Sequence, residues 1–419
     1  MILYKYFTVF LCLFTLSSCF SDVIEDFDVK KINTKSIEET LIDIDLSHFK
    51  SLKDTTDIPI LAWMGIPENY TSIERYQEMK DAGFYINLSN YSNAENLQIA
   101  LDIAQQLNMK VMIRCPELYT HTENIVRRFK DHPANGGYFL QDEPYVDAFS
   151  NLRSLVERIE AIDSNNFCYI NLNPNYAFHS LQVYNEYVET FLENIPIKIL
   201  SFDNYPIVDN FIRESWYHNL EIIKLASNNK QIPFWAFALS TAHGQYPIPD
   251  INQLRLQVYS NLAYGAKGIQ YFTYWTPVSK TWDFHAGPIE SDGKKTDVYY
   301  SVKDLNNEFQ KLSYVFLSSE VTRVTHSGKV PQGTSEFLNP PYFFNSLNIY
   351  GGSALISEME NDKNSFLMIQ NTNINSEIAV KIKTDTQTQI ILKNGVLIPA
   401  NYINGEFKLT PGDMAIFMR

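Results

Sequence analysis

Eight short apolar runs alternate with helix-like segments along the middle of the chain, and this alternation is the feature that most limits the possible folds. Each run is continuously apolar, as in "PILAWMGIP" (59–67) and "GIQYFTYWTP" (268–277), instead of switching between apolar and polar residues. Continuous apolar runs are typical of parallel strands that are covered on both faces. The other runs lie at 84–90, 110–118, 136–144, 167–174, 198–206 and 233–240.

The segments between the runs have helical periodicity. In "AENLQIALDIAQQLN", for example, Leu97, Leu101 and Ala104 fall on one face. Eight strand–helix units over roughly 260 residues match a TIM (β/α)8 barrel in number and length. A doubly wound sheet would carry a glycine-rich fingerprint after its first strand, and none follows residues 59–67. The sequence therefore predicts an α/β fold with a TIM barrel over residues 56–318.

The last hundred residues have a different pattern. Short runs such as "ALISEME", "SFLMIQN" and "EIAVKIK" are separated by turns rich in Asn, Asp and Gly, and Asn394-Gly395 is a type I′ hairpin signal. Residues 319–419 are therefore predicted to form a small antiparallel β-sandwich domain that packs against the barrel.

The first nineteen residues predict a lipoprotein signal peptide. Lys5 is followed by an apolar stretch from Phe7 to Leu16 and by "LSSC", which resembles a bacterial lipobox ending at Cys19. We expect Cys19 to be lipidated and residues 20–55, which are polar and acidic, to tether the lipid to the barrel. This interpretation implies a secreted, lipid-anchored protein at the outer membrane or cell surface of a Gram-negative bacterium.

The amino-acid composition limits the kinds of molecule that the protein is expected to bind. A formal net charge of −14 argues against nucleic acid and anionic membrane surfaces, so a neutral substrate is expected and the membrane is contacted only through the N-terminal lipid. Cys115 and Cys168 lie inside apolar runs and are predicted to be free core thiols. No Cys/His cluster has zinc spacing, and neither a metal nor an organic cofactor is implied.

Barrel active sites lie at the carboxyl ends of the strands, so the last residues of the eight runs are considered together. The fourth run, "GGYFLQDEPY", ends in the adjacent carboxylates Asp142 and Glu143, and the sixth ends in Asp203. Carboxylates transfer protons, amides and arginine bind hydroxyls, and flat aromatic rings stack on sugars, a mixture that suits neutral carbohydrate. His243 is expected to be an ordinary surface residue. The predicted substrate-binding residues are Trp63, Asn87, Arg114, Glu117, Asn173, Tyr205, Tyr274 and Trp275.

The order of these motifs resembles that of the (β/α)8 clan of glycoside hydrolases. "LQDEP", "SFDNYP" and "GIQYFTYW" followed by "DGKKTDVYYSVKDLNNEFQKL" are most similar to bacterial family 42 β-galactosidases and related barrels of Bacteroidetes lipoproteins. The resemblance covers the barrel and, more weakly, the terminal β domain. It implies a glycosidase in which Glu143, the strand-four glutamate, is the general acid/base. A glutamate beside Asp142 in a partly dry barrel mouth should have a raised pKa, as an acid needs near neutral pH.

The seventh run departs from the clan, whose nucleophile is a glutamate at the end of that strand. Here "PFWAFALSTAHG" has no carboxylate. One explanation is a second carboxylate from another strand, such as Asp203, Glu117 or Glu290. A second is that Asp142 and Glu143 act together in substrate-assisted catalysis on a 2-acetamido sugar, as the Asp-Glu pair does in family 20 hexosaminidases. The third is a non-catalytic glycan-binding protein on a hydrolase-like barrel.

Overall fold

The computed structural model describes residues 34–52, 56–209, 211–403 and 405–419. The signal peptide, Cys19 and residues 20–33 and 53–55 of the expected tether lie outside the described residues. No helix in the described ranges combines the length and the apolar character that crossing a bilayer would require.

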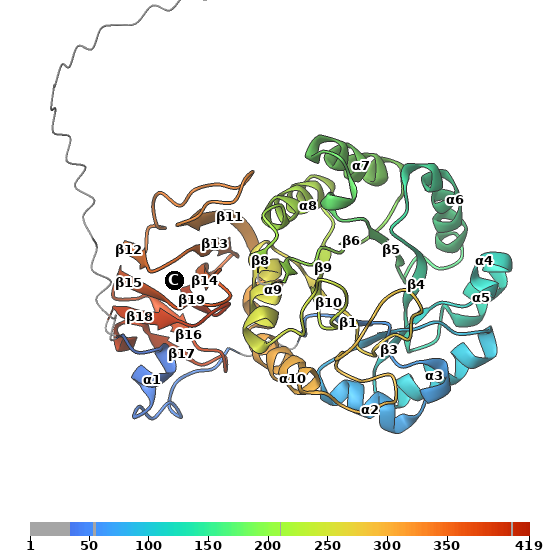
Figure 1. Ribbon diagram of the computed structural model, residues 1–419, viewed down its shortest axis with the longest axis horizontal. Helices are drawn as coiled ribbons and strands as arrows, with labels where there is room; N and C mark the ends of the chain where they lie inside the picture. Colours follow the sequence, from blue (N-terminus) through green and yellow to red (C-terminus); the bar gives the residue numbers. More distant parts are fainter. Residues whose placement is uncertain (1–33, 53–55, 210, 404) are drawn as a thin grey trace, which may run out of the picture. The chain divides into compact units, whose positions relative to one another are not determined.

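A closed barrel of eight parallel strands forms the larger part of the fold (Figure 1), in the order β1-β10-β9-β6-β5-β4-β3-β2. Its strands are β1 (Ile60–Trp63), β2 (Ile86–Leu88), β3 (Lys110–Ile113), β4 (Asn135–Asp142), β5 (Cys168–Leu172), β6 (Leu200–Phe202), β9 (Phe234–Leu239) and β10 (Gly268–Phe272). Each of the eight predicted runs overlaps one of these strands, so the predicted TIM barrel is confirmed.

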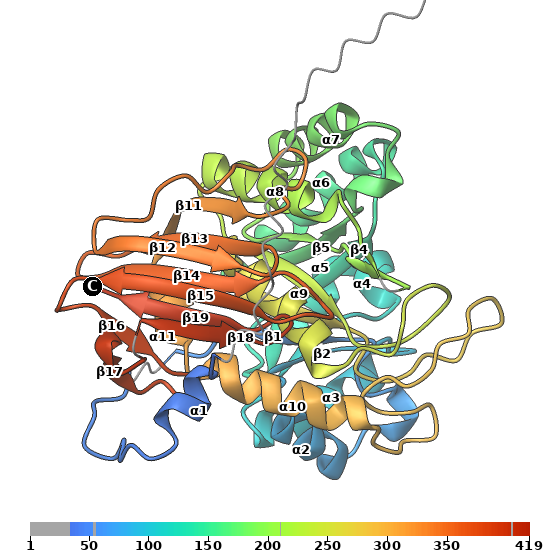
Figure 2. The same ribbon diagram turned by 60° about the vertical axis from the view of Figure 1, so that its left-hand side comes forward.

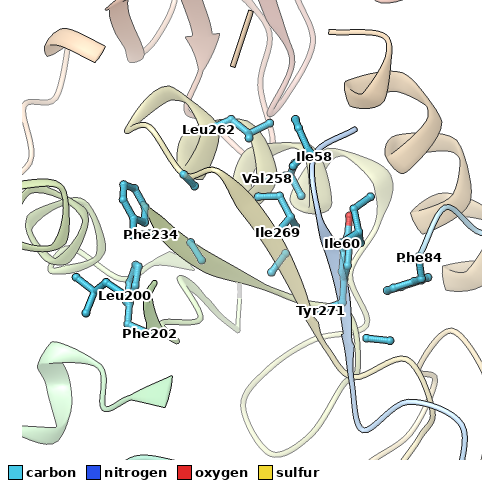
Figure 3. Packing of buried hydrophobic residues seen from close by; sticks show 14 of the residues in the cluster. Ile58, Ile60, Phe84, Leu200, Phe202, Phe234, Val258, Leu262, Ile269 and Tyr271 are labelled. Carbon is cyan, nitrogen blue, oxygen red and sulfur yellow. The ribbon is translucent and has the colours of Figure 1, made fainter. Parts of the chain in front are cut away.

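Helices surround the barrel because each carries one apolar face that the strands bury. They are α2 (Ile73–Asp81), α3 (Ala94–Gln106), α4 (Glu117–Thr120), α5 (Thr122–Phe129), α6 (Phe149–Glu160), α7 (Leu181–Asn194), α8 (Trp216–Lys230), α9 (Ile251–Ala263) and α10 (Asp297–Gln310). Figure 3 shows this layer from close by: strand residues such as Ile60, Phe234 and Ile269 lie in one apolar cluster with Val258 and Leu262 of α9. A short hairpin of β7 (Ile207–Val208) and β8 (Phe211–Ile212) follows β6.

A β-bulge in β4 determines which side chains face the barrel interior. Tyr138 pairs with Cys168 and Phe139 with Tyr169, but after the bulge Gln141 pairs with Ile170 and Asp142 with Asn171. Phe139 and Tyr169 belong to the cluster that fills the barrel interior. Because side chains alternate along a strand, the extra residue returns Asp142 to the interior face, where uninterrupted alternation would have turned it outward.

The C-terminal domain consists of two antiparallel sheets, which confirms the predicted sandwich. The larger sheet has the order β11-β13-β14-β19-β16-β17 and the smaller has the order β12-β15-β18. After α11 (Ser313–Ser318), the strands are β11 (Glu320–Ser327), β12 (Phe344–Tyr350), β13 (Ala354–Glu360), β14 (Ser365–Asn371), β15 (Ile378–Thr384), β16 (Gln389–Ile391), β17 (Leu397–Pro399), β18 (Glu406–Leu409) and β19 (Met414–Met418).

Helix α9 lies between the barrel and this domain, as both views show (Figures 1 and 2). Ser260 Oγ donates to Gln370 Oε1 at 2.8 Å, and Ser357 Oγ donates to the carbonyl of Ala263 at 2.7 Å. Gln370 also donates to the carbonyl of Leu256 at 3.2 Å. The side chains of these two β-domain residues are fully buried.

The segment expected as a tether is folded where the structure describes it. Ile37 and Leu41 of α1 (Ile37–Leu41) are buried in the apolar core of the β domain. Leu397 donates its backbone N–H to the Lys50 carbonyl, and Leu52 donates its own to Gly395, both at 2.8 Å. Residues 34–52 therefore pack as part of the β domain instead of spanning open space. Cys115 and Cys168 are buried free thiols, as predicted.

Candidate active site

A pocket of about 350 Å³ opens at the carboxyl ends of the barrel strands. It contains all three predicted catalytic carboxyl groups, so we call it the carboxyl pocket. Its lining is Trp63, Asp142, Glu143, Asn171, Tyr176, Asp203, Tyr205, Phe237, His243, Tyr246, Phe272, Trp282 and Phe284. Aromatic rings thus surround a small acidic centre.

Glu143 occupies a backbone conformation that non-glycine residues rarely adopt. Its φ is +45°, and its N–H donates to the carbonyl of Asn171 at 2.8 Å. Pro144 follows, and its carbonyl accepts from Tyr187 Oη at 2.7 Å. The strained residue is thereby fixed from both sides at the end of β4, and strain of this kind gathers at functional sites.

Asn171 of β5 connects two of the carboxyl groups. Its Nδ2 donates to Asp203 Oδ1 at 2.8 Å and to Asp142 Oδ1 at 3.2 Å. Its Oδ1 accepts from Ser201 Oγ at 2.9 Å, which fixes the orientation of the amide. Ser201 in turn accepts from Gln270 Nε2 at 2.9 Å, inside the barrel. A single amide, held by a buried hydroxyl, therefore positions both aspartates.

The carboxyl groups raise one another's affinity for protons. Burial and then the charge of Glu143 raise the pKa of Asp203 well above its usual value. Burial, followed by the charge of Asp142, raises the pKa of Glu143, whereas a hydrogen bond from Asp203 works against that rise. Burial also raises the pKa of Asp142. Asp142 and Glu143 are open to solvent through the pocket mouth, but the surrounding protein still removes enough water to raise the pKa of both groups.

Asp203 is the most enclosed member, at 6% exposed, and it is hydrogen-bonded to Glu143. Two carboxyl groups in direct contact must share a proton, because two adjacent negative charges cannot both be stabilised there. The pair can therefore hold a proton at a pH where isolated carboxyl groups have lost theirs.

This arrangement predicts an unusual dependence of stability on pH. A carboxyl group whose folded-state pKa is raised stabilises the fold at low pH, and that stability is lost as the pH rises through the raised value. We expect Asp203→Asn, which keeps the shape and removes the charge, to increase the free energy of unfolding by about 1–2 kcal/mol at pH 8 and to change it little at pH 4. Urea unfolding at both pH values measures this difference, and an equal effect at both would contradict the shared-proton arrangement.

Two of the predicted sugar-binding aromatics line the carboxyl pocket. Trp63, at 5% exposed, lies in the interior cluster with its ring edge-on to Phe139 and Phe237, and Tyr205 packs edge-on against Tyr246. Both present mainly apolar surface to the site. Trp282, which is not among the predicted substrate-binding residues, lines the same pocket and is 56% exposed.

The predicted amides Asn87 and Asn173 do not line the pocket. Asn87 is fully buried: its Oδ1 accepts from the Ile66 N–H at 2.9 Å, and its Nδ2 donates to two tyrosine hydroxyls at 3.0 Å. A Cβ on Gly65 would lie 1.9 Å from this oxygen, so only glycine fits there. Asn173 donates to the Pro144 carbonyl at 3.2 Å. Both amides hold loops of the barrel mouth, and their predicted contact with substrate is not supported.

The charged candidates that follow β3 also lie outside the pocket. The Arg114 guanidinium lies 4.1 Å from the centre of the Phe139 ring, and burial lowers its pKa while the charge of Asp142 opposes that change. Glu117 accepts from the backbone N–H of Ala94 at 3.3 Å, at the start of α3. Glu290, the other alternative second carboxylate, accepts from the Ala286 N–H at 3.1 Å. Of the three alternatives, only Asp203 reaches Glu143.

Tyr274 and Trp275 do not form an open platform over the carboxyl groups. Tyr274 is fully buried and its hydroxyl has no partner among the described residues. Trp275 is 4% exposed and packs against Tyr70, with ring centres 4.7 Å apart. It lines a different pocket, next to the first.

His243 was expected at the surface but is 7% exposed and lines the carboxyl pocket. Its Nδ1 lies 3.0 Å from the Thr241 carbonyl, which can only accept, so Nδ1 carries the hydrogen. Burial lowers its pKa, so it is a neutral imidazole at neutral pH. The ring also contacts Trp282 edge-on, and the Gly244 N–H donates to Asp283 at 2.7 Å, which ties the loop after β10 to the end of β9. The chain after β9 therefore contributes a neutral imidazole to the carboxyl pocket.

The described residues contain no group of three or more His, Cys, Asp or Glu side chains arranged to hold a metal ion.

Comparison with known proteins agrees with the barrel fold. The family model for glycoside hydrolase family 42, described as Beta-galactosidase, matches residues 155–312. The expected resemblance to family 42 barrels is confirmed. The family 42 match runs from α6 to the end of α10 and includes Asn171, Asp203 and His243, but it begins after Asp142 and Glu143.

Solved family 42 structures share the fold. A β-galactosidase from Bacillus circulans sp. alkalophilus superposes with a TM-score of 0.59 at 11% identity, over 87% of this chain and 99% of that one. A family 42 β-galactosidase from G. stearothermophilus, solved as a catalytic mutant, gives 0.58 at 9% identity, over 88% and 99%. At these identities the shared property is the fold. For the Marinomonas ef1 β-galactosidase, the match (12% identity, TM-score 0.48) covers 61% of this chain but only 60% of that one. No curated protein matches the sequence.

Proposed function

We propose that this protein is a glycoside hydrolase that cleaves O-glycosyl bonds in a neutral oligo- or polysaccharide, with Glu143 as the general acid/base. The observation that carries the proposal is Glu143 itself, a strained glutamate with a raised pKa in a barrel-mouth pocket walled by aromatic rings. The family 42 match and the shared fold support a glycosidase.

In the first half of such a reaction the acid gives its proton to the glycosidic oxygen as the bond from that oxygen to the anomeric carbon breaks. Positive charge then develops on the sugar ring, and a nearby carboxylate stabilises it. Water completes the reaction and returns a proton to the base. Glu143, with a shared proton available from Asp203, is suited to the acid role, and Asp142 is the carboxylate left to face the positive charge.

The position of the second carboxyl group limits which glycosidase mechanism is possible. Retaining glycosidases separate their two carboxyl groups by about 5–5.5 Å and inverting ones by about 6.5–9.5 Å. Glu143 and Asp203 are hydrogen-bonded directly to each other. We therefore assign Asp203 to proton storage and orientation. Asp142 either stabilises the oxocarbenium-like transition state directly or orients the 2-acetamido group of a substrate that assists its own cleavage.

A second candidate function is non-catalytic glycan binding on the same scaffold. It is favoured by β9, which ends without a carboxylate and brings the neutral His243 to the pocket. Aromatic walls and an acidic floor could hold a sugar without cleaving it.

A glycoside panel distinguishes the two functions. The protein is assayed on aryl α- and β-glycosides of galactose, glucose, mannose, xylose, fucose and N-acetylglucosamine, and on oligosaccharides of the same sugars. Turnover of at least one substrate is expected, whereas calorimetric binding of a sugar without any product would support the binding function. Turnover confined to N-acetyl sugars would favour substrate assistance.

We further propose that Cys19 carries the lipid anchor. In a Gram-negative host the wild-type protein should incorporate radiolabelled palmitate and sediment with membranes, and Cys19→Ala should abolish both. Cys12→Ala is the matched control, because that cysteine lies within the apolar part of the signal and should change neither. Labelling that survives in Cys19→Ala would refute the anchor.

A further inference from the structure

A second pocket, of about 380 Å³, lies beside the carboxyl pocket at the ends of β1, β2 and β10. We call it the rim pocket. Its polar lining residues are Glu68, Asn69, Ser89, Asn90, Thr276 and Ser291. No role in the reaction proposed above uses these groups.

The two pockets share one wall. Trp63 lines the carboxyl pocket, and the next residue, Met64, lines the rim pocket. The carbonyls of these two residues accept from the N–H groups of Tyr274 and Trp275 at 3.1 and 2.9 Å, which joins the chain after β1 to the chain after β10. The two pockets are therefore neighbours on either side of the chain at the end of β1.

The rim pocket is equipped for hydroxyl groups. The side-chain amides of Asn69 and Asn90 have no hydrogen-bond partner among the described residues, and the Asn90 side chain is exposed. Each amide offers one acceptor and two hydrogens, as a sugar hydroxyl requires. Glu68 adds acceptor oxygens, and it is held in place by the N–H and Oγ of Ser92, at 2.5 and 2.9 Å.

An aromatic wall completes the rim pocket. Tyr70 packs on Trp275, and the Arg75 guanidinium lies 5.3 Å from the centre of the Trp275 ring and 6.0 Å from that of Tyr70. This stack holds the rings rigidly, so little conformational entropy would be lost when a flat ligand packs against Tyr70. Lysine and arginine do not line the pocket within the described ranges, so it is not suited to anions.

From these observations we propose that the rim pocket is a sugar subsite, which binds a further neutral sugar unit of the glycan whose scissile bond lies at the carboxyl pocket. The inference rests on the proposed function, which places the scissile bond of the glycan at the carboxyl pocket. The binding that it predicts does not require hydrolysis. It implies that the substrate is an oligosaccharide or polysaccharide with at least one unit beyond those in the carboxyl pocket.

The test combines chain length with a double variant, Asn69→Ala/Asn90→Ala. Neither amide is bonded to the protein, so the fold should be unaffected, as thermal unfolding would verify. Galacto-, gluco-, manno- and xylo-oligosaccharides of one to five units are titrated calorimetrically into Glu143→Gln and into Glu143→Gln carrying the double change. For the sugar that binds, we expect affinity to rise about tenfold at the length that reaches the rim pocket, and the double variant to lose that rise while binding shorter sugars normally.

Kinetics then separate this inference from the proposed function. On an active wild-type background the double change should leave kcat/KM for an aryl monoglycoside unaltered and lower it about tenfold for the longer oligosaccharide. If length-dependent binding is lost in the double variant but no substrate is ever cleaved, the subsite stands and the hydrolase proposal fails. If affinity does not depend on length, or if the double change weakens short and long sugars equally, the rim pocket is not a sugar subsite.

Discussion

Glu143→Gln is expected to lower kcat by about 10²–10⁴-fold on substrates with poor leaving groups. Glutamine has the shape of the acid but no proton to give, so the loss should follow the need for that proton. The rate should fall most for phenyl glycosides and natural oligosaccharides. For dinitrophenyl glycosides, whose leaving group departs as a stable anion, the rate of the step that breaks the glycosidic bond should fall far less.

The leaving-group series is therefore the measurement, and Asp147→Asn is the matched control. Asp147 is an exposed carboxylate in the turn η2 (Val146–Ala148), close to Glu143 in sequence but absent from the pocket lining. Asp147→Asn should have the kcat of the wild type with every leaving group. An equal loss across the series for Glu143→Gln would show that Glu143 does not deliver the proton.

Asn171→Ala is expected to have the second-largest effect. Removing the amide leaves Asp142 and Asp203 without their shared donor and Ser201 without its acceptor. Since the amide lowers the pKa of both aspartates, its loss should move the pH dependence of kcat/KM to higher pH. We expect kcat/KM to fall about 100-fold and the free energy of unfolding to fall by about 2–3 kcal/mol.

Asn306→Ala provides the control for stability. Asn306 of α10 is equally buried, donates to the Ala82 carbonyl at 2.7 Å and accepts from Tyr271 Oη at 2.8 Å, on the outer side of the barrel wall. It should destabilise the protein to a similar degree without moving the pH profile. If the two variants shift the profile alike, or if neither does, Asn171 has no part in setting the protonation of the carboxyl groups.

The strands could be predicted from sequence because their outward residues are apolar and must be buried under helices. The same reasoning places Asp142, Glu143 and Asp203 at one end of the barrel, and the structure brings them together. The aspect that no local pattern reveals is the bulge in β4, because an inserted residue changes pairing with a neighbour without changing hydrophobicity. Unless the bulge is known, the sequence does not reveal whether Asp142 or Gln141 faces the barrel interior.

Asn171 was missed in favour of Asn173, although a signal was available. Cys168, Ile170 and Leu172 are the residues of β5 that pack outward, so Tyr169 and Asn171 must face the interior. Asn173 lies beyond the strand, where alternation no longer fixes direction. The predictions for Asn87 and Tyr274 were wrong for another reason. A side chain near the end of a strand can pack against the loops around the barrel mouth as well as point into the pocket above the strands. His243 packs against Trp282 and Phe284 of a loop that is distant in sequence, a contact that no local pattern reveals.

Helix α9 has a thermodynamic consequence. It is one of the helices that cover the outside of the barrel, and its other side is hydrogen-bonded to Gln370 and Ser357 of the β domain. Separating the two parts would expose buried polar groups that have partners only in the intact chain. Their folding free energies are therefore not independent, and heat should unfold the barrel and the β domain in a single calorimetric transition.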